Sequence, residues 1–444
     1  MKLVALVSTF ALSAVLMGHA QETRVPPTQN APTFARDVAP IFYSKCVSCH
    51  RPGEIAPMSL ITFQDARPWA RAIRDKVSSR EMPPWFADPA HGAFRNDRSL
   101  TPAQIETIVK WVDGGARQGD ASQMPALPAL AAGWQIGKPD VVFEMPAEYH
   151  IPADGSVDYQ YFEVPTNFKE DRWIRAGEVR AGNPEHVHHI IVSVIEPPGN
   201  ARPNVMSVRA IADGNDAAAR APRTLTEAQR AQFAAAARRA NAVSLVNWAV
   251  GEDAPVYPAG LAKRIPAGST LQFQVHYTTN GAAATDRSKI GLIFMKEPPK
   301  SEVRTALIAN AQFAIPAGAA NHQIEAEATF NDNVKVWTMH PHMHLRGKDM
   351  TYTAIYPDGR QEVILHVPKY DFGWQTDYWL AQPLSLPKGS KLHVTAHFDN
   401  SPANRFNPDP ATTVRWGDQT WEEMMIGYIT YTVDNGSVAT VAQR

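Results

Sequence analysis

Three histidines, His340, His342 and His344, fall within five residues of an apolar segment that is typical of a β-strand. Alternate residues of a strand lie on one face of the sheet, so the three imidazoles are expected to point the same way. Neighbouring imidazoles on one face suit a d-block metal ion. A polar edge strand is the alternative interpretation. Two further clusters, at residues 186–189 and around His276, lie in similar strand-like runs, and this repetition favours metal binding.

The two cysteines of the chain, Cys46 and Cys49, form the motif Cys-x-x-Cys-His together with His50. This spacing attaches a c-type haem, because the two thiols form thioethers to the porphyrin and the histidine binds the iron. A redox dithiol or half of a zinc site is the alternative interpretation, but the sequence has no second cysteine pair. The predicted cofactor is one covalent haem c.

The second axial ligand of the haem iron must come from a segment that reaches the opposite face of the ring. Met58, Met82 and His91 are the nearby candidates. Met58 follows His50 too closely to wrap round the haem. Met82 is followed by two prolines, which hold an extended loop that cannot return to helix. Met82 is therefore the predicted ligand.

Residues 1–20 have the features of a secretory signal peptide, with Lys2, an apolar run from Leu3 to Met17 and small residues before Gln21. The run is short for a membrane span, and an uncleaved anchor is the alternative. We predict an exported, periplasmic or secreted protein with no membrane span in the mature chain. The 43 basic and 44 acidic side chains nearly balance, which gives no electrostatic case for nucleic acid as a partner.

The segment 33–118 combines short amphipathic helical patterns with the haem motif and the methionine loop. Its last helix is predicted to begin at a capping box formed by Thr101 and Gln104, with proline at the first helical position. The order of helix, haem motif, helix, methionine loop and terminal helix resembles a class I cytochrome c. Residues 119–135 are rich in Ala, Pro and Gly and predict a linker.

Beyond residue 135, short alternating runs bounded by Pro, Gly and Asn are typical of β-sandwiches. The run 265–276 is repeated at 386–397, each time from a Pro-Gly turn to a histidine, which predicts two similar domains at 136–298 and 299–444. The predicted fold class is a small all-α cytochrome c domain followed by two tandem all-β antiparallel sandwich domains of jelly-roll type. An Ala- and Arg-rich insertion, 225–240, predicts a surface helix.

Taken together, the histidine clusters and the Glu423-Met424 pair resemble the copper type II, ascorbate-dependent monooxygenases. This family includes the peptidylglycine α-hydroxylating and dopamine β-monooxygenases. The resemblance covers roughly residues 140–440. It implies two copper ions, an electron-transfer copper in the first sandwich and an oxygen-activating copper in the second. The implied ligands are His188, His189 and His276 for the first ion and His342, His344 and Met424 for the second.

The adjacent residues His188 and His189 raise a geometric difficulty, because a regular strand sends neighbouring side chains to opposite faces. They can share one ion only at a β-bulge or at a strand end. Strict alternation would pair His186 with His188 instead. The sequence leaves both pairs open.

The chain departs from the family pattern at positions that bear on the substrate. The peptide-hydroxylating members have an arginine that binds a substrate carboxylate at the position of His340. Tyr428 matches a substrate-site tyrosine, whereas Ile426 and Thr430 replace an asparagine and a methionine. The resemblance therefore implies His340 and Tyr428 as catalytic-site residues and argues against a peptidylglycine substrate.

These observations predict a haem- and copper-containing monooxygenase that hydroxylates a C–H bond of a small organic substrate with O2. The haem would receive electrons from an external donor and take the place of ascorbate. The alternative is an electron-transfer or copper-binding protein without hydroxylase activity. The sequence specifies neither the substrate nor the donor.

The remaining histidines and several tryptophans have structural interpretations. His397 is the repeat counterpart of His276, and we interpret it as a structural histidine because the family takes its ligand from Met424. Five histidines stand alone in the sequence and are predicted to be surface or core residues, namely His91, His150, His322, His366 and His393. Trp337, Trp416 and Trp421 are predicted to pack in the core near the second copper, with an electron-relay role as the alternative.

Overall fold

The computed structural model describes residues 31–434 except 55, 130–132, 201, 203, 213–241 and 250. The predicted signal peptide and the predicted surface helix 225–240 lie outside the described residues. Within the described residues, none of the helices has the length and apolar character needed to cross a bilayer.

The helices of the described chain all lie before residue 124. They share one hydrophobic core, in which Phe34, Phe42 and Trp111 meet with ring centroids 5.9 to 6.4 Å apart. The predicted capping box is present, since the Thr101 side chain accepts from the Gln104 amide and the Gln104 side chain accepts from the Thr101 amide. The helices are η1 (Phe34–Val38), α1 (Ala39–Lys45), α2 (Phe63–Ala66), η2 (Arg67–Trp69), α3 (Ala70–Ser78), α4 (Pro102–Asp113) and η3 (Ala121–Gln123).

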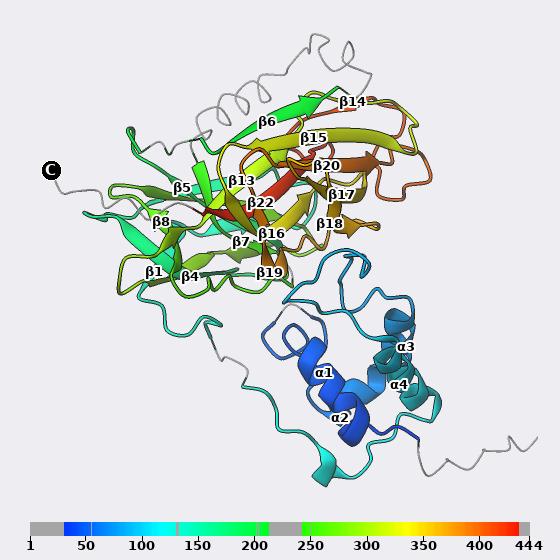
Figure 1. Cartoon of the computed structure of the whole chain (residues 1–444). Coiled ribbons are helices and arrows are strands. Elements are labelled where there is room, and N and C mark those ends of the chain that lie inside the picture. The colour runs from blue at the N-terminus through cyan, green and yellow to red at the C-terminus, as the bar shows by residue number, and fades with distance from the viewer. Residues whose placement is uncertain are drawn as a thin grey trace, which may run out of the picture.

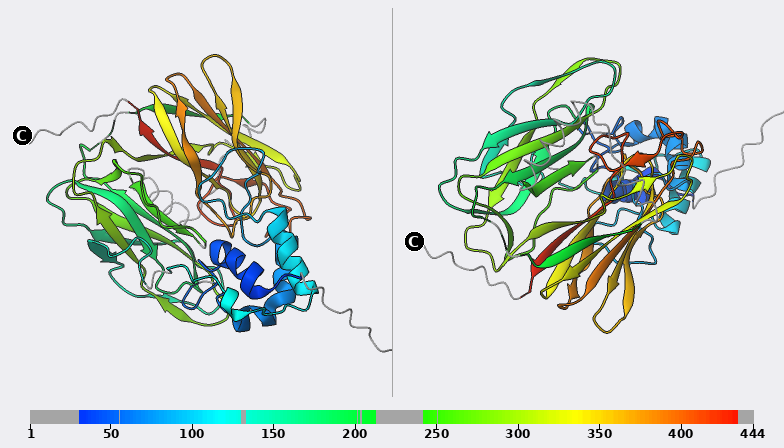
Figure 2. Two further views of the ribbon diagram at one scale, coloured as in Figure 1. Left: turned by 60° about the horizontal axis from the view of Figure 1, so that its bottom comes forward. Right: turned by 90° about the horizontal axis from the view of Figure 1, so that it is seen from above.

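The β-rich part of the chain contains four larger sheets (Figures 1 and 2). The first has the strand order β1 (Val141–Glu144), β11 (Lys289–Phe294), β4 (Arg172–Arg180), β8 (Leu261–Ile265) and β12 (Ser301–Glu302). The second has the order β3 (Gln160–Pro165), β9 (Thr270–Tyr277), β5 (Val187–Ile195) and β7 (Ala242–Ala249). One hydrophobic core takes side chains from both sheets, such as Ile290 of β11 and Phe273 of β9.

The third and fourth sheets contribute to another hydrophobic core, in which Tyr352 of β17 and Ile429 of β22 are buried. The third sheet has the order β18 (Gln361–Val367), β17 (Gly347–Ile355), β20 (Lys391–Phe398), β15 (His322–Phe330) and β6 (Met206–Ile211). The fourth has the order β13 (Arg304–Ala309), β22 (Ile426–Val433), β16 (Val334–His342) and β19 (Tyr378–Leu386). Two short pairs complete the strands, β2 (Tyr149–Ile151) with β10 (Ala284–Asp286) and β14 (Ala314–Ile315) with β21 (Val414–Arg415).

The predicted fold class, an all-α cytochrome c domain followed by two tandem all-β antiparallel sandwiches, is wrong. The structure is mostly β, with 39% strand and 12% helix, and its short helices do not make a sizeable all-α domain. β12 pairs with β8 in parallel, so the sheets are not all antiparallel. β6 leaves the first half of the chain and pairs with β15 of the second half. Alternating hydrophobicity predicts strands, but it does not specify which strands share a sheet.

A segment between α3 and α4, residues 85–98, lies along the β-rich part, and we call it the strap. Its Phe94 forms a β-bridge with Leu380 of β19. Backbone hydrogen bonds extend this pairing, from the Ala381 amide to the Ala93 carbonyl at 2.7 Å and from the Arg95 amide to the Trp379 carbonyl at 2.9 Å. The strap therefore holds the helices against the end of the β-rich part below β18 and β19 (Figure 1).

Gly92 allows the strap to approach β18 closely. Its φ angle is +76°, and a Cβ atom there would lie 2.6 Å from the backbone oxygen of Ile364. We predict that Gly92→Ala lowers the free energy of unfolding by more than about 2 kcal/mol, because backbone strain and a clash with a main-chain atom act together. Chemical denaturation of both proteins measures the difference.

Gly359→Ala provides the matched control. Gly359 has a similar φ of +87°, but nothing lies within 4 Å of a Cβ atom built there. Gly359→Ala should lower the free energy of unfolding by roughly 1 kcal/mol, from backbone strain alone. Equal losses in the two variants would show that the close approach of the strap contributes no stability.

Candidate functional site

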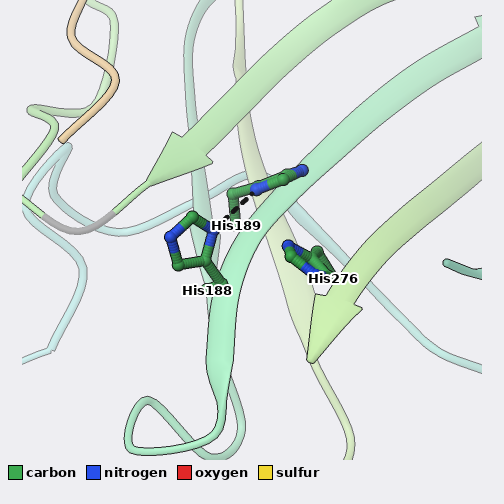
Figure 3. Close-up of side chains that lie close together, drawn as sticks. All are labelled: His188, His189 and His276. Atoms are coloured by element: carbon green, nitrogen blue, oxygen red, sulfur yellow. Dashed lines mark hydrogen bonds between the residues drawn. The ribbon is translucent and has the colours of Figure 1, made fainter. Parts of the chain in front are cut away.

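Three histidines converge where β5 and β9 lie side by side, and we call His188, His189 and His276 the first histidine cluster (Figure 3). One ring nitrogen of each residue lies within 4.8 Å of those of the other two. The pairing of β5 with β9 shifts register between Val187 and His189, and His189 then pairs with His276. This irregularity lets two consecutive side chains reach one place. Of the two pairs that the sequence left open, the register shift is compatible with His188 and His189.

The Nδ1 atoms of the first histidine cluster lack ordinary hydrogen-bond partners, whereas Nε2 of His276 lies 3.5 Å from the Thr420 hydroxyl. The Nδ1 atoms of His188 and His189 face each other at 3.0 Å, and Nδ1 of His276 is buried without a partner. A buried nitrogen with no partner costs free energy unless a ligand satisfies it. His186 differs, because its Nδ1 lies 3.2 Å from the Thr278 carbonyl oxygen. The structure thus brings His189, not His186, to His188 and His276.

Burial keeps the first histidine cluster in the form that binds metals. It lowers the pKa of His188 to about 4 and the pKa of His276 to about 3. It also lowers the pKa of His189 well below its ordinary value, and the neighbouring histidines add to this effect. The imidazoles are therefore neutral at pH 7, and each retains a lone pair for a metal ion.

His342, the last residue of β16, and His344, two residues beyond it, form the second histidine cluster. Their rings are perpendicular, with centroids 5.3 Å apart. Nδ1 of His342 donates to Oε1 of Gln375 at 2.6 Å, and Nδ1 of His344 donates to the Glu422 carbonyl oxygen at 3.2 Å. Because both acceptors are oxygens of an amide or peptide group, the remaining lone pair of each ring is on Nε2. Burial lowers the pKa of His342 to about 4 and that of His344 to about 3.

A buried carboxylate ties Met424 to the second histidine cluster. Oε2 of Glu423 accepts from the backbone amides of His344, at 2.8 Å, and of Met424, at 3.3 Å. Its Oε1 accepts from the Arg346 amide at 2.6 Å. Met424 is half-buried, whereas its neighbour Met425 is fully buried in the hydrophobic core. Of the two methionines, Met424 is therefore the one with a side chain outside the core.

One phenyl ring lies between the two histidine clusters. Phe372 stacks on His188, with ring centroids 5.0 Å apart and an interplanar angle of 20°. Its centroid also lies 6.2 Å from that of His276 and 5.9 Å from that of His344. Phe372 belongs to the segment Asp371–Asp377, between β18 and β19, which we call the bridging loop.

His340 is held by two carboxylates rather than by the second histidine cluster. Its Nδ1 lies 3.0 Å from Oδ1 of Asp377 and 3.6 Å from Oε1 of Glu252. Burial alone would lower the pKa of His340, but hydrogen bonding and charge from Asp377 and Glu252 raise it to about 10. Tyr428 packs beside it, with its ring centroid 5.8 Å from that of His340 and 6.1 Å from that of His342.

A cavity of about 200 Å³ reaches both histidine clusters. It is lined by His189 of the first cluster and His342 of the second. The two residues predicted for the catalytic site, His340 and Tyr428, also line it. Most of the other side chains at its wall are neutral and polar, including Tyr161, Ser193, Ser244, Asn247, Gln272, Gln274 and Gln375.

The haem motif borders a separate cavity of about 470 Å³. Its wall includes Cys46, Cys49 and His50 together with Met58 and Met82. His50 donates from Nδ1 to the backbone oxygen of Met58 at 3.1 Å, which leaves Nε2 with the lone pair that an iron ion requires. The two thiols, the oriented imidazole and the two thioethers fit a covalently attached haem.

The β-rich part also contributes to the wall of this haem cavity, through Gly251 and Trp374. Sequence reasoning did not single out either residue. It also missed Phe372, Gln375 and the carboxylates that hold His340, because none of these lies near a ligand motif in the sequence. The run Asp371-Phe372-Gly373-Trp374-Gln375 contains turn-forming and aromatic residues, which is the only local signal.

Several of the structural interpretations need revision. His91 and His366 do not stand alone, since they form a group with Asp88 in which the ligand atoms lie within 4.8 Å of one another. Trp421 does not pack in the core, because 46% of it is exposed. His397 donates from Nδ1 to Oδ1 of Asp349 at 2.6 Å, as a structural histidine would.

No protein-family model matches this chain, and no curated protein matches it either. The structural comparison finds PNGF-II, at 8% identity over 66% of this chain and 65% of that chain, with a TM-score of 0.26. It also finds allantoicase, at 10% identity over 57% of this chain and 79% of that chain, with a TM-score of 0.15. The chain thus spans slightly less than two thirds of PNGF-II. Likenesses at these TM-scores carry no argument about fold or function.

The convergence of ring nitrogens predicts which histidines bind metal. His276→Ala should abolish uptake of a copper ion by the first histidine cluster, because it removes one of three converging donors. His186→Ala should retain that ion, since the His186 ring is hydrogen-bonded to the Thr278 carbonyl oxygen instead. Copper content after dialysis, measured by atomic emission, distinguishes the variants. Loss of copper from His186→Ala with retention in His276→Ala would reverse the assignment.

Proposed function

We propose that this chain is an exported, haem- and copper-containing monooxygenase that hydroxylates a C–H bond of a small organic substrate with O2. The observation that carries this proposal is the meeting of two buried, neutral histidine clusters at one cavity, on either side of Phe372. A site for a single structural metal needs only one such cluster. Two clusters at one cavity suit a reaction in which one ion stores an electron while the other acts on O2.

The donor atoms support copper at both clusters. In the first, three imidazoles would hold the ion, and imidazole is a good ligand of copper in both oxidation states. In the second, the Nε2 atoms of His342 and His344 and the thioether of Met424 would hold it, and a thioether favours Cu(I). Copper bound at these clusters would supply electrons and the activation of O2.

Residues that hydrogen-bond to the proposed ligands hold the second histidine cluster in place. Gln375 and the Glu422 carbonyl hold the two rings by their Nδ1 atoms, so that both Nε2 atoms are available to one ion. Glu423 holds the adjoining backbone by its three amide contacts. The site is thus organised before a metal binds, which limits the rearrangement that catalysis would require.

The cavity argues for a small, polar and uncharged substrate. A volume of about 200 Å³ is below the range of roughly 300–1,000 Å³ that is usual for drug-sized ligands. His340, at its wall, is already paired with Asp377 and Glu252, so it offers no free positive charge to a substrate carboxylate. Tyr428, which also lines the cavity, offers a hydroxyl group that could orient the substrate beside His342.

Oxygen uptake tests the proposed function. The overall reaction takes a C–H substrate, O2, two electrons and two protons to an alcohol and water. Reduced protein loaded with haem and copper should consume O2 and form product only when a suitable small molecule is present. His342→Ala should abolish uptake while leaving the haem spectrum unchanged. Stable copper binding without uptake, across a broad panel of substrates, would favour an electron-transfer or copper-binding protein.

The contrast between Met424 and Met425 predicts the sulfur ligand of the second copper. X-ray absorption of the reduced protein should show a sulfur scatterer near copper that disappears in Met424→Ile, because a thioether binds Cu(I) well. Met425→Ile is the matched control, since its side chain is buried in the core. A sulfur signal that survives in Met424→Ile and disappears in Met425→Ile would assign the neighbouring methionine.

For the haem, we predict His50 and Met82 as the axial ligands. Met58 also lines the cavity, but its backbone oxygen accepts from the ring of His50. Met58 would therefore lie on the same side of a bound haem as His50. Met82→Ala should lose the near-infrared sulfur-to-iron band and lower the reduction potential, because thioether ligation raises it. The same change in Met58→Ala, with none in Met82→Ala, would contradict the assignment.

A further inference from the structure

We propose that the bridging loop, Asp371–Asp377, is the electron path from the haem cavity to the histidine clusters, and that Trp374 is its entry residue. This inference rests on the proposed function, since it assumes haem in one cavity and copper at the clusters. It adds an electron-transfer role for residues that bind neither cofactor.

The entry residue lies at the boundary between the haem cavity and the β-rich part. Trp374 lines the haem cavity together with Gly251 and Arg98. A Cβ atom built on Gly251 would lie 3.3 Å from Cζ3 of Trp374, so the indole packs directly against this glycine. Arg98, at the end of the strap, donates to the Gly251 carbonyl and pairs with Asp253. The indole therefore packs on a glycine that the strap itself binds through Arg98.

A continuous chain of bonds leads from Trp374 to the second histidine cluster. Gln375 is the next residue, and its Oε1 accepts from Nδ1 of His342 at 2.6 Å. Its Nε2 donates to the Phe372 carbonyl at 3.3 Å, which fixes the orientation of the amide. Electronic coupling decays more slowly through covalent and hydrogen bonds than across gaps. Two adjacent residues and one short hydrogen bond thus join the haem cavity to His342.

The same loop reaches the first histidine cluster through Phe372. Its ring stacks on that of His188 at 5.0 Å and lies 5.9 Å from that of His344. An electron that arrives along the bridging loop therefore has short routes to both clusters. Each transfer would oxidise the haem from Fe(II) to Fe(III) and reduce one Cu(II) to Cu(I). The external electron donor would have to reduce the haem again between the two transfers that supply the two electrons of the hydroxylation.

Anaerobic rapid mixing tests the path without turnover. Protein with reduced haem is mixed with Cu(II), and the haem spectrum is followed as the haem is reoxidised. Trp374→Leu should slow reoxidation severalfold while leaving the haem spectrum, the haem reduction potential and the copper content unchanged. Trp374→Phe should restore part of the rate, because it keeps an aromatic ring at the wall. Trp421→Leu is the matched control, since Trp421 is 46% exposed and does not line the haem cavity.

Gln375→Leu provides a second test that leaves the haem cavity complete. It removes the hydrogen bond to His342, and it should slow reoxidation even if Trp374→Leu fails to bind haem. The path would be overturned if copper-loaded Gln375→Leu and at least one copper-loaded Trp374 variant, Trp374→Phe or Trp374→Leu, reoxidised their haem at the wild-type rate. The route would then run through Gly251, the other residue of the β-rich part at the haem cavity. Ala249, two residues before it in the chain, pairs with His189. Failure of the wild-type haem to reduce Cu(II) would instead count against the proposed function.

Discussion

The organisation of the second histidine cluster depends on the buried carboxylate of Glu423. An isolated carboxylate in a protein interior is costly, and hydrogen bonds must offset that cost. Glu423 has them from three backbone amides, of His344, Arg346 and Met424, and Arg346 is itself buried. These contacts join the end of β16 to the segment before β22. Without them, the two histidines and the methionine would belong to separate, independently placed loops.

The histidine-rich segments were largely predictable from the sequence, because most of their histidines lie on strands. His340 and His342 alternate on β16, as period-two spacing predicts, but His344 lies two residues beyond the end of the strand. The sequence named a bulge as the condition for His188 and His189 to share an ion but did not choose between that pair and His186 with His188; the register of β5 with β9 shifts at this point. Local rules thus located the histidine-rich segments, but they did not select which histidines converge.

The sequence did not predict the long-range arrangement. The exchange of β6 into the second half and the parallel pairing of β12 depend on distant contacts that no local pattern encodes. The Glu252–His340–Asp377 group is also assembled from three distant segments. The sequence showed that His340 stands where the family has an arginine, but it did not show that two carboxylates hold this histidine. The position of Trp421 was not predicted either. It was expected in the core, but an aromatic residue near a site can also lie at the surface.

The strap has a consequence for attempts to dissect the protein into modules. The Ala- and Pro-rich segment 119–135 looks like a natural place to cut the chain, but the strap precedes it and is shared by both sides. A β-rich fragment that begins at residue 119 would leave the Ala381 amide and the Trp379 carbonyl without their strap partners. Such unpaired backbone groups make an edge that can pair with another chain. Fragments of this protein should therefore include the strap with the β-rich part, even when the helices are removed.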